Sequence, residues 1–93
     1  MTLDQLLTRA TAEYVQRPNT KGQVKWTVRG RTVYLADYAG GGHIGRYDVT
    51  ALRDGRIKMT WVDDDRDHDP VVVDRTVDAV LAQLDDIQLR DLY

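Results

Sequence analysis

Apolar and polar side chains alternate through most of residues 24–62, VKWTVRGRTVYLADYAGGGHIGRYDVTALRDGRIKMTWV. A period of two residues indicates β-strands that bury one face and expose the other. Two turn signals interrupt the alternation, Arg29-Gly30 and Arg53-Asp54-Gly55, and each predicts a β-hairpin. The segment therefore predicts four antiparallel strands.

The cross-strand pairs can be predicted for both hairpins. A two-residue Arg29-Gly30 loop pairs Val28 with Arg31, Trp26 with Val33 and Val24 with Leu35. In the second hairpin a one-residue slip would exchange the two faces, so the apolar pattern fixes the register. A three-residue loop with Gly55 in the left-handed conformation then gives the following pairs: Ala51 with Ile57, Val49 with Met59, and Tyr47 with Trp61.

An amphipathic helix is predicted on each side of this segment. Thr2 and Gln5 match a capping box, and Pro18 ends the first helix near Gln16. Asp74 is the expected N-cap of the second helix, which we expect to fray near Asp86 because acidic residues oppose the helix dipole there. The apolar faces are Leu3, Leu6, Leu7, Ala10 and Tyr14 in the first helix, and Val77, Val80, Leu81 and Leu84 in the second.

The predicted fold is α+β, with one α-β-β-β-β-α domain over residues 1–93 and a four-stranded antiparallel meander sheet. Val71-Val72-Val73 is the candidate for a fifth strand, and as an edge strand it would allow two copies to pair as a homodimer. Both helices are expected on one sheet face, the one that carries Trp26, Val33, Leu35, Val49, Met59 and Trp61. The opposite face carries Tyr34, Ala36 and Tyr38 and is too apolar for plain solvent exposure.

The composition narrows the classes of partner and location. The chain has 93 residues, no cysteine and a net charge of −2, which excludes disulfides and thiolate metal sites. No stretch approaches the roughly 18 apolar residues of a membrane span, and no signal-peptide pattern opens the chain. We therefore expect a cytoplasmic protein without a membrane partner. Nucleic acid is not an expected partner either, because the charge balance gives no strong positive field.

An acidic run covers residues 63–69, DDDRDHD. Carboxylate oxygens suit Ca²⁺ or Mg²⁺, so a divalent-metal-binding enzyme or regulator using Asp63, Asp65, Asp67 and Asp69 is one alternative. Pro70 and Thr76, however, occupy positions where an EF-hand loop needs Gly and Glu. The favoured interpretation is a solvated loop, with docking on an Arg-rich partner or acidic mimicry of nucleic acid as further alternatives.

The chain carries no catalytic or cofactor motif. It contains no serine, and its histidines, His43 and His68, both lie in predicted loops. Gly40-Gly41-Gly42 lacks the Lys-Ser/Thr pair and the following helix of a P-loop. We therefore expect a non-enzymatic protein without a cofactor.

Tyrosine and arginine gather around the hairpins, and both are over-represented at interface hot spots. The group comprises Tyr34, Tyr38, Tyr47, Arg29, Arg31 and Arg46. Tyr34 and Tyr38 are the better candidates because they lie opposite the expected helix layer. The predicted partner-binding residues are Tyr34, Tyr38, His43, Arg46, Asp64 and Asp67.

A short single domain without cysteine, rich in Asp, Arg and Val and without an enzymatic motif, resembles in size and composition the small accessory proteins of actinobacterial phages. These are host-takeover or anti-defence proteins. The resemblance implies a protein that binds a host protein and inhibits or redirects it. It rests on no motif, so it assigns no role to any residue.

Overall fold

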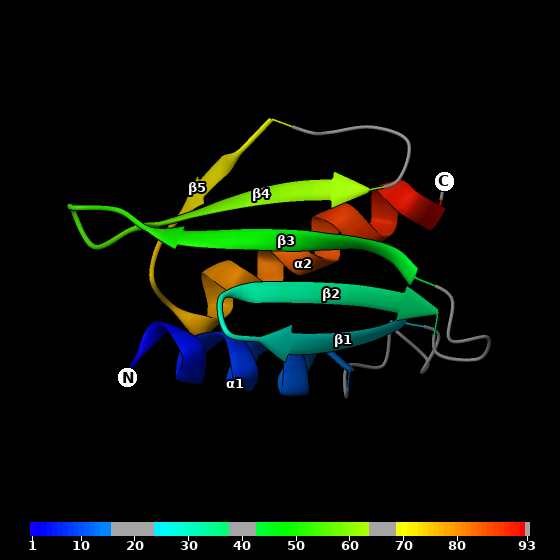
Figure 1. Ribbon diagram of the computed structural model, residues 1–93, viewed down its shortest axis with the longest axis horizontal. Helices are drawn as coiled ribbons and strands as arrows, with labels where there is room; N and C mark the ends of the chain where they lie inside the picture. Colours follow the sequence, from blue (N-terminus) through cyan, green and yellow to red (C-terminus); the bar gives the residue numbers. More distant parts are fainter. Residues whose placement is uncertain (16–23, 38–42, 64–68, 93) are drawn as a thin grey trace.

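The computed structural model describes residues 1–15, 24–37, 43–63 and 69–92. The elements follow in the order α1 (Leu3–Val15), β1 (Val24–Arg29), β2 (Thr32–Asp37), β3 (His43–Ala51), β4 (Ile57–Asp63), β5 (Val71–Val73) and α2 (Val77–Leu92). The strands form one five-stranded sheet in chain order, and all its pairs are antiparallel (Figure 1). The predicted α+β meander is confirmed, and Val71–Val73 is the fifth strand.

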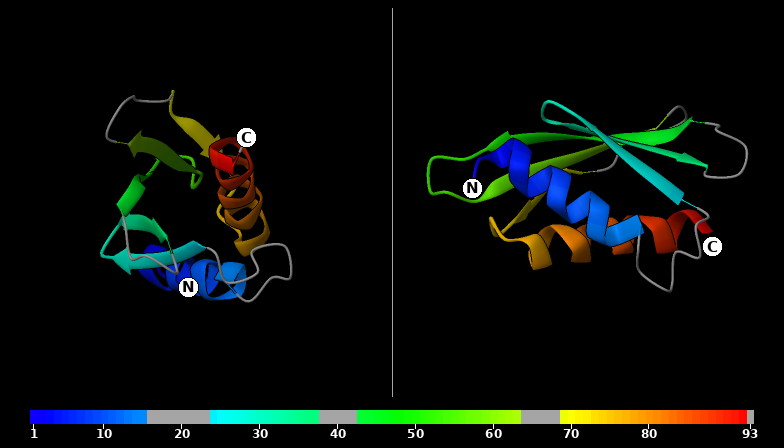
Figure 2. Two further views of the ribbon diagram at one scale, coloured as in Figure 1. Left: turned by 90° about the vertical axis from the view of Figure 1, so that its right-hand side faces the viewer. Right: turned by 90° about the horizontal axis from the view of Figure 1, so that it is seen from below.

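Both helices lie on one side of the sheet, as predicted (Figure 2). α1 packs against β1 and α2, and α2 also contacts β5. Tyr47 of β3 ties the sheet to α2: its hydroxyl donates to the carbonyl oxygen of Gln83 at 3.2 Å and accepts from the Gln83 amide at 3.2 Å. The sheet thus has one covered face, which meets the helices, and one opposite face.

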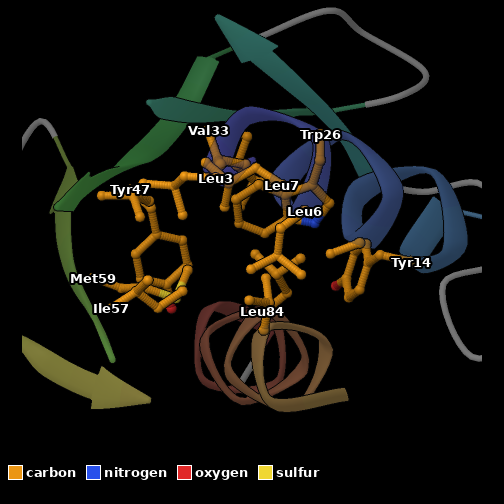
Figure 3. Packing of buried hydrophobic residues seen from close by; sticks show 14 of the residues in the cluster. Leu3, Leu6, Leu7, Tyr14, Trp26, Val33, Tyr47, Ile57, Met59 and Leu84 are labelled. Carbon is orange, nitrogen blue, oxygen red and sulfur yellow. The ribbon is translucent and has the colours of Figure 1, made fainter. Parts of the chain in front are cut away.

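The core fills the space between the sheet and the two helices (Figure 3). Its buried side chains include the whole predicted apolar face of α1 and all six predicted sheet residues, Trp26, Val33, Leu35, Val49, Met59 and Trp61. Burying one large apolar side chain contributes roughly 1.5–3 kcal/mol. In a chain without disulfides, this layer supplies the stability that the fold needs.

Four aromatic rings form the centre of this core. Trp26 stacks on Tyr47 with ring centroids 5.9 Å apart, and Tyr14 meets Trp26 edge-on at 5.6 Å. Trp61 packs edge-on against Tyr47 at 5.0 Å. β3, which is the neighbour of the strand that carries Trp61, contains Gly45. An added Cβ at Gly45 would lie 2.6 Å from the indole of Trp61. Glycine is therefore required there by packing.

The second hairpin has the predicted register. Ala51 pairs with Ile57, Val49 with Met59 and Tyr47 with Trp61. Gly55 has a φ of 90°, in the left-handed region that favours glycine. The apolar pattern and the Arg53-Asp54-Gly55 turn were sufficient to predict this hairpin.

The predicted register of the first hairpin is wrong by two residues. Trp26 pairs with Leu35 and Val28 with Val33, so the loop residues are Gly30 and Arg31 and not Arg29 and Gly30. Gly30 has a φ of 62°, as the first position of a tight hairpin loop requires. The observed register places apolar side chains opposite one another, whereas the predicted one set Val28 opposite Arg31. Both registers keep the same residues on the same face.

The start of α1 is confirmed and the start of α2 is corrected. The Gln5 amide N–H donates to the Thr2 hydroxyl at 3.1 Å, and the Thr2 N–H donates to the Gln5 side chain at 2.9 Å, which completes the capping box. In α2 the cap is Thr76 and not Asp74, because the Thr76 hydroxyl accepts from the Ala79 N–H at 3.1 Å. α2 continues to Leu92. The expected fraying near Asp86 stays a prediction.

Candidate functional site

The sheet face opposite the helices, which we call the open face, is not covered by any element among the described residues (Figure 2). Its side chains alternate with the buried ones along each strand. It comprises Lys25, Thr27 and Arg29 of β1, Thr32, Tyr34 and Ala36 of β2, Arg46, Asp48 and Thr50 of β3, Lys58, Thr60 and Val62 of β4, and Val72 of β5. The face is mainly threonine and basic residues, with one aromatic ring among the residues that the structure describes.

Tyr34 lies between two arginines on the open face. Its cross-strand neighbours are Thr27 of β1 and Arg46 of β3. The guanidinium carbon of Arg29 lies 5.9 Å from the centroid of the Tyr34 ring, within the range of a cation–π contact. Tyr34 is therefore half-buried by its neighbours on the sheet, without a covering helix.

Arg46 is held in place by Asp48, two residues along the same strand and therefore on the same face. The Arg46 Nε lies 3.3 Å from a carboxylate oxygen of Asp48. Both side chains remain partly exposed, with relative areas of 39% and 49%, so the pair adds little stability. The pair lies beside Tyr34, because Arg46 is the cross-strand neighbour of Tyr34.

The structure brings together two of the predicted partner-binding residues, Tyr34 and Arg46. His43 is the first residue of β3 and pairs with Ala36, but its side chain lies outside the described residues. Tyr38, Asp64 and Asp67 also lie outside them. Tyr47 is not a surface residue: it is 1% exposed and belongs to the core, because it shares its face with Val49.

Two basic residues of the open face, Lys25 and Lys58, were missed by the sequence reasoning. They come from β1 and β4, and only the strand order shows that they belong to one surface. The alternation of the strands did indicate their position. Lys25 precedes the buried Trp26 and Lys58 precedes the buried Met59, so both lysines lie on the face opposite the core.

The proposed metal ligands are not brought together by the described residues. Asp69 is exposed, while Asp65, Asp67 and the side chain of Asp63 lie outside the described part of the chain. Within residues 1–15, 24–37, 43–63 and 69–92, no group of three His, Asp or Glu side chains could hold a metal ion. The acidic run therefore remains a sequence observation.

β5 lies at one edge of the sheet and pairs with β4. Val71 and Val72 are 37% and 43% exposed, which is unusual for valine in a strand. The predicted edge strand is thus present, and pairing of two copies through it stays a prediction.

No protein-family model, curated protein or solved structure matches this chain. None of the helices in the described residues has the length and apolar character that crossing a membrane requires. A function for the chain is therefore inferred from the residues of its open face.

Proposed function

We propose that this chain is a non-enzymatic interaction module that binds another protein through the open face of its sheet. The observation that carries the proposal is the position of Tyr34 between Arg29 and Arg46, on a face that no described element covers. Binding of this kind would inhibit or redirect the partner. We expect it to take place in the cytoplasm.

The residue types at this position support the proposal. Tyrosine and arginine are enriched among the few residues that carry most of the energy of an interface. A tyrosine ring offers a large contact area and loses little conformational entropy on binding, because it has only two side-chain torsions. Arginine offers donors in a planar fork that fits a carboxylate.

The local geometry also favours binding, because the three side chains contact their neighbours on the sheet. The Arg29 guanidinium lies over the Tyr34 ring, and Arg46 pairs with Asp48. Ordering a side chain at an interface costs about 0.5–1.5 kcal/mol, and preorganisation avoids part of this cost. The strands beneath are held by the core on the covered face, so the surface is built on a rigid support.

The expected partner is a host protein, because the chain resembles small phage accessory proteins in size and composition. Such proteins act by occupying a surface of their target. This mode of action requires a stable scaffold with one exposed contact surface, and it requires no catalytic group.

The test is affinity capture from host lysate with the tagged protein and three variants. Tyr34→Ala should lose the specific partner, because the ring at the centre of the surface is removed. Tyr34→Phe should retain it, because the ring and its cation–π contact remain. Arg9→Ala is the control, since it removes a side chain that is 63% exposed from α1, in the helix layer. Circular dichroism would show that all variants are folded.

Capture that is the same for the wild type and Tyr34→Ala would reject the open face as the binding surface. Loss of the partner in Arg9→Ala, with Tyr34→Ala unaffected, would place the interface on the helix layer instead. A partner lost only in Tyr34→Ala would support the proposal and could then be identified by mass spectrometry.

A further inference from the structure

The charges of the open face have the opposite sign to those of the whole chain. The open face carries four basic side chains, Lys25, Arg29, Arg46 and Lys58, and one acidic side chain, Asp48. The chain as a whole has a net charge of −2. The other described side chains are mostly acidic: Asp4, Glu13, Asp54, Asp69, Asp74, Asp78, Asp85 and Asp86 against Arg9, Arg31, Arg53, Arg56 and Arg75. Folding therefore concentrates positive charge on one surface.

Most of this positive charge is not paired with an acidic side chain in the described part of the chain. Asp48 pairs with Arg46, but Lys25, Arg29 and Lys58 form no ion pair with any carboxylate that the structure describes. Away from the open face, by contrast, Arg9 pairs with Glu13 at 3.2 Å and Arg56 with Asp54 at 2.7 Å. Among the described residues these cations are thus uncompensated, which is the property that an acidic ligand would require.

The four cations match a ligand of limited length. Lys25 and Arg29 lie on β1, Arg46 on β3 and Lys58 on β4, and neighbouring strands are about 4.8 Å apart. The distance from β1 to β4 across the strands is therefore about 14 Å. The register also places Lys58 about six residues, or roughly 20 Å, from Lys25 along the strand direction, so these two cations lie about 24 Å apart. An extended acidic stretch of about seven or eight residues would span the face from Lys25 to Lys58.

The same observations favour a protein segment over a nucleic acid. A protein that binds single-stranded nucleic acid usually offers several aromatic platforms for base stacking, and Tyr34 is the one aromatic side chain among the described residues of the open face. A nucleic acid longer than the patch would also extend over the acidic remainder of the surface. A short carboxylate-rich segment avoids that repulsion.

We infer that the open face binds an acidic segment of its partner protein, with several Asp or Glu residues within one short stretch. Arg29 and Arg46 hold carboxylates on the two sides of Tyr34, and Lys25 and Lys58 extend the attraction along the sheet. The inference rests on the proposed function and specifies the chemistry of the partner.

The test uses fluorescence polarisation with purified protein and three labelled probes of equal length: oligoglutamate, oligoglutamine and oligothymidylate. The key variant is Lys25→Glu/Lys58→Glu, which leaves Tyr34 and its two arginines unchanged. The matched control is Arg9→Glu/Arg53→Glu, which alters the net charge by the same amount at exposed positions off the open face. Each probe is titrated at low and at high ionic strength.

We expect the wild type to bind oligoglutamate, to lose affinity as salt is added, and to ignore oligoglutamine. Lys25→Glu/Lys58→Glu should weaken binding by about tenfold or more, and the control should weaken it much less. Equal weakening by both double variants would overturn the inference, because only the net charge would then matter. Tighter binding of oligothymidylate would also overturn it, in favour of a nucleic acid.

Failure of this inference can be distinguished from failure of the proposed function. If the lysate partner is captured in a Tyr34-dependent manner and Lys25→Glu/Lys58→Glu captures it as well as the wild type does, the acidic segment is wrong and the interaction module stands. If Tyr34→Ala captures the partner normally, the proposed surface itself is wrong. Salt-dependent self-association of the wild type in sedimentation would overturn the inference too, because a second copy would then be the occupant.

Discussion

The carboxylate of Asp54, in the turn between β3 and β4, accepts two hydrogen bonds from Arg56. The Arg56 Nε donates to one oxygen at 2.7 Å, and the Arg56 backbone N–H donates to the other at 3.0 Å. These bonds favour the ionised form, so the Arg56 side chain and then its backbone N–H lower the pKa of Asp54 below its ordinary value. Both groups are exposed, and the effect is therefore confined to the turn.

The lowered pKa of Asp54 predicts how this turn responds to acid. The pKa of Asp54 is lower in the folded chain than in the unfolded chain. The stabilisation of the fold by the ionised Asp54 is therefore fully present at pH values above the unfolded pKa. It is lost as the pH falls through the folded pKa. An NMR titration should show Asp54 ionising at lower pH in the wild type than in Arg56→Gln, where the side-chain hydrogen bond is absent. Identical titration curves would show that the Arg56 side chain does not act on the carboxylate.

The two hairpins show what the sequence can predict about a strand pair and where its information ends. For the hairpin of β3 and β4, the competing registers differed by one residue and so exchanged the faces, which the apolar pattern could decide. For the hairpin of β1 and β2, the competing registers differed by two residues and kept the faces. The alternation could not separate them, and the choice depended on whether Gly30 is the first or the second residue of the loop.

The cap of α2 is a second case in which two local solutions compete. Asp74 and Thr76 are both good N-cap residues, and the structure selects Thr76. Thr76→Ala should therefore lower the free energy of unfolding by about 1 kcal/mol, because the Ala79 N–H loses its acceptor. Asp74→Ala, measured by the same urea denaturation, should change it by less than about 0.5 kcal/mol. The opposite ranking would assign the cap to Asp74.

The candidate surface could be predicted only in part, because it is a property of the whole molecule. Tyr34 and Arg46 were recognisable from residue type, and the structure places them opposite each other on β2 and β3. The collection of Lys25 and Lys58 on the same face depends on the order of four strands, which no local pattern contains. The segregation of charge between the open face and the rest of the surface was hidden for the same reason, since the net charge averages over both.

The separation between a covered face and an open face predicts losses of stability of very different size for two chemically identical substitutions. Tyr47, which is 1% exposed, packs among Trp26 and Trp61 and bonds to Gln83 of α2. Tyr47→Ala should cost about 4 kcal/mol, a large part of the 5–15 kcal/mol that stabilises a typical domain. Tyr34→Ala removes the same atoms from the open face and should cost about 1 kcal/mol.

Urea denaturation of the two variants, beside the wild type, measures this difference directly. A large loss of stability in Tyr47→Ala and a small one in Tyr34→Ala would show that folding depends on the covered face, which leaves the open face available for a partner. Similar losses in both variants would mean that Tyr34 is part of the scaffold. A defect of Tyr34→Ala in partner capture would then have to be attributed to folding, so this comparison decides how the capture experiment is interpreted.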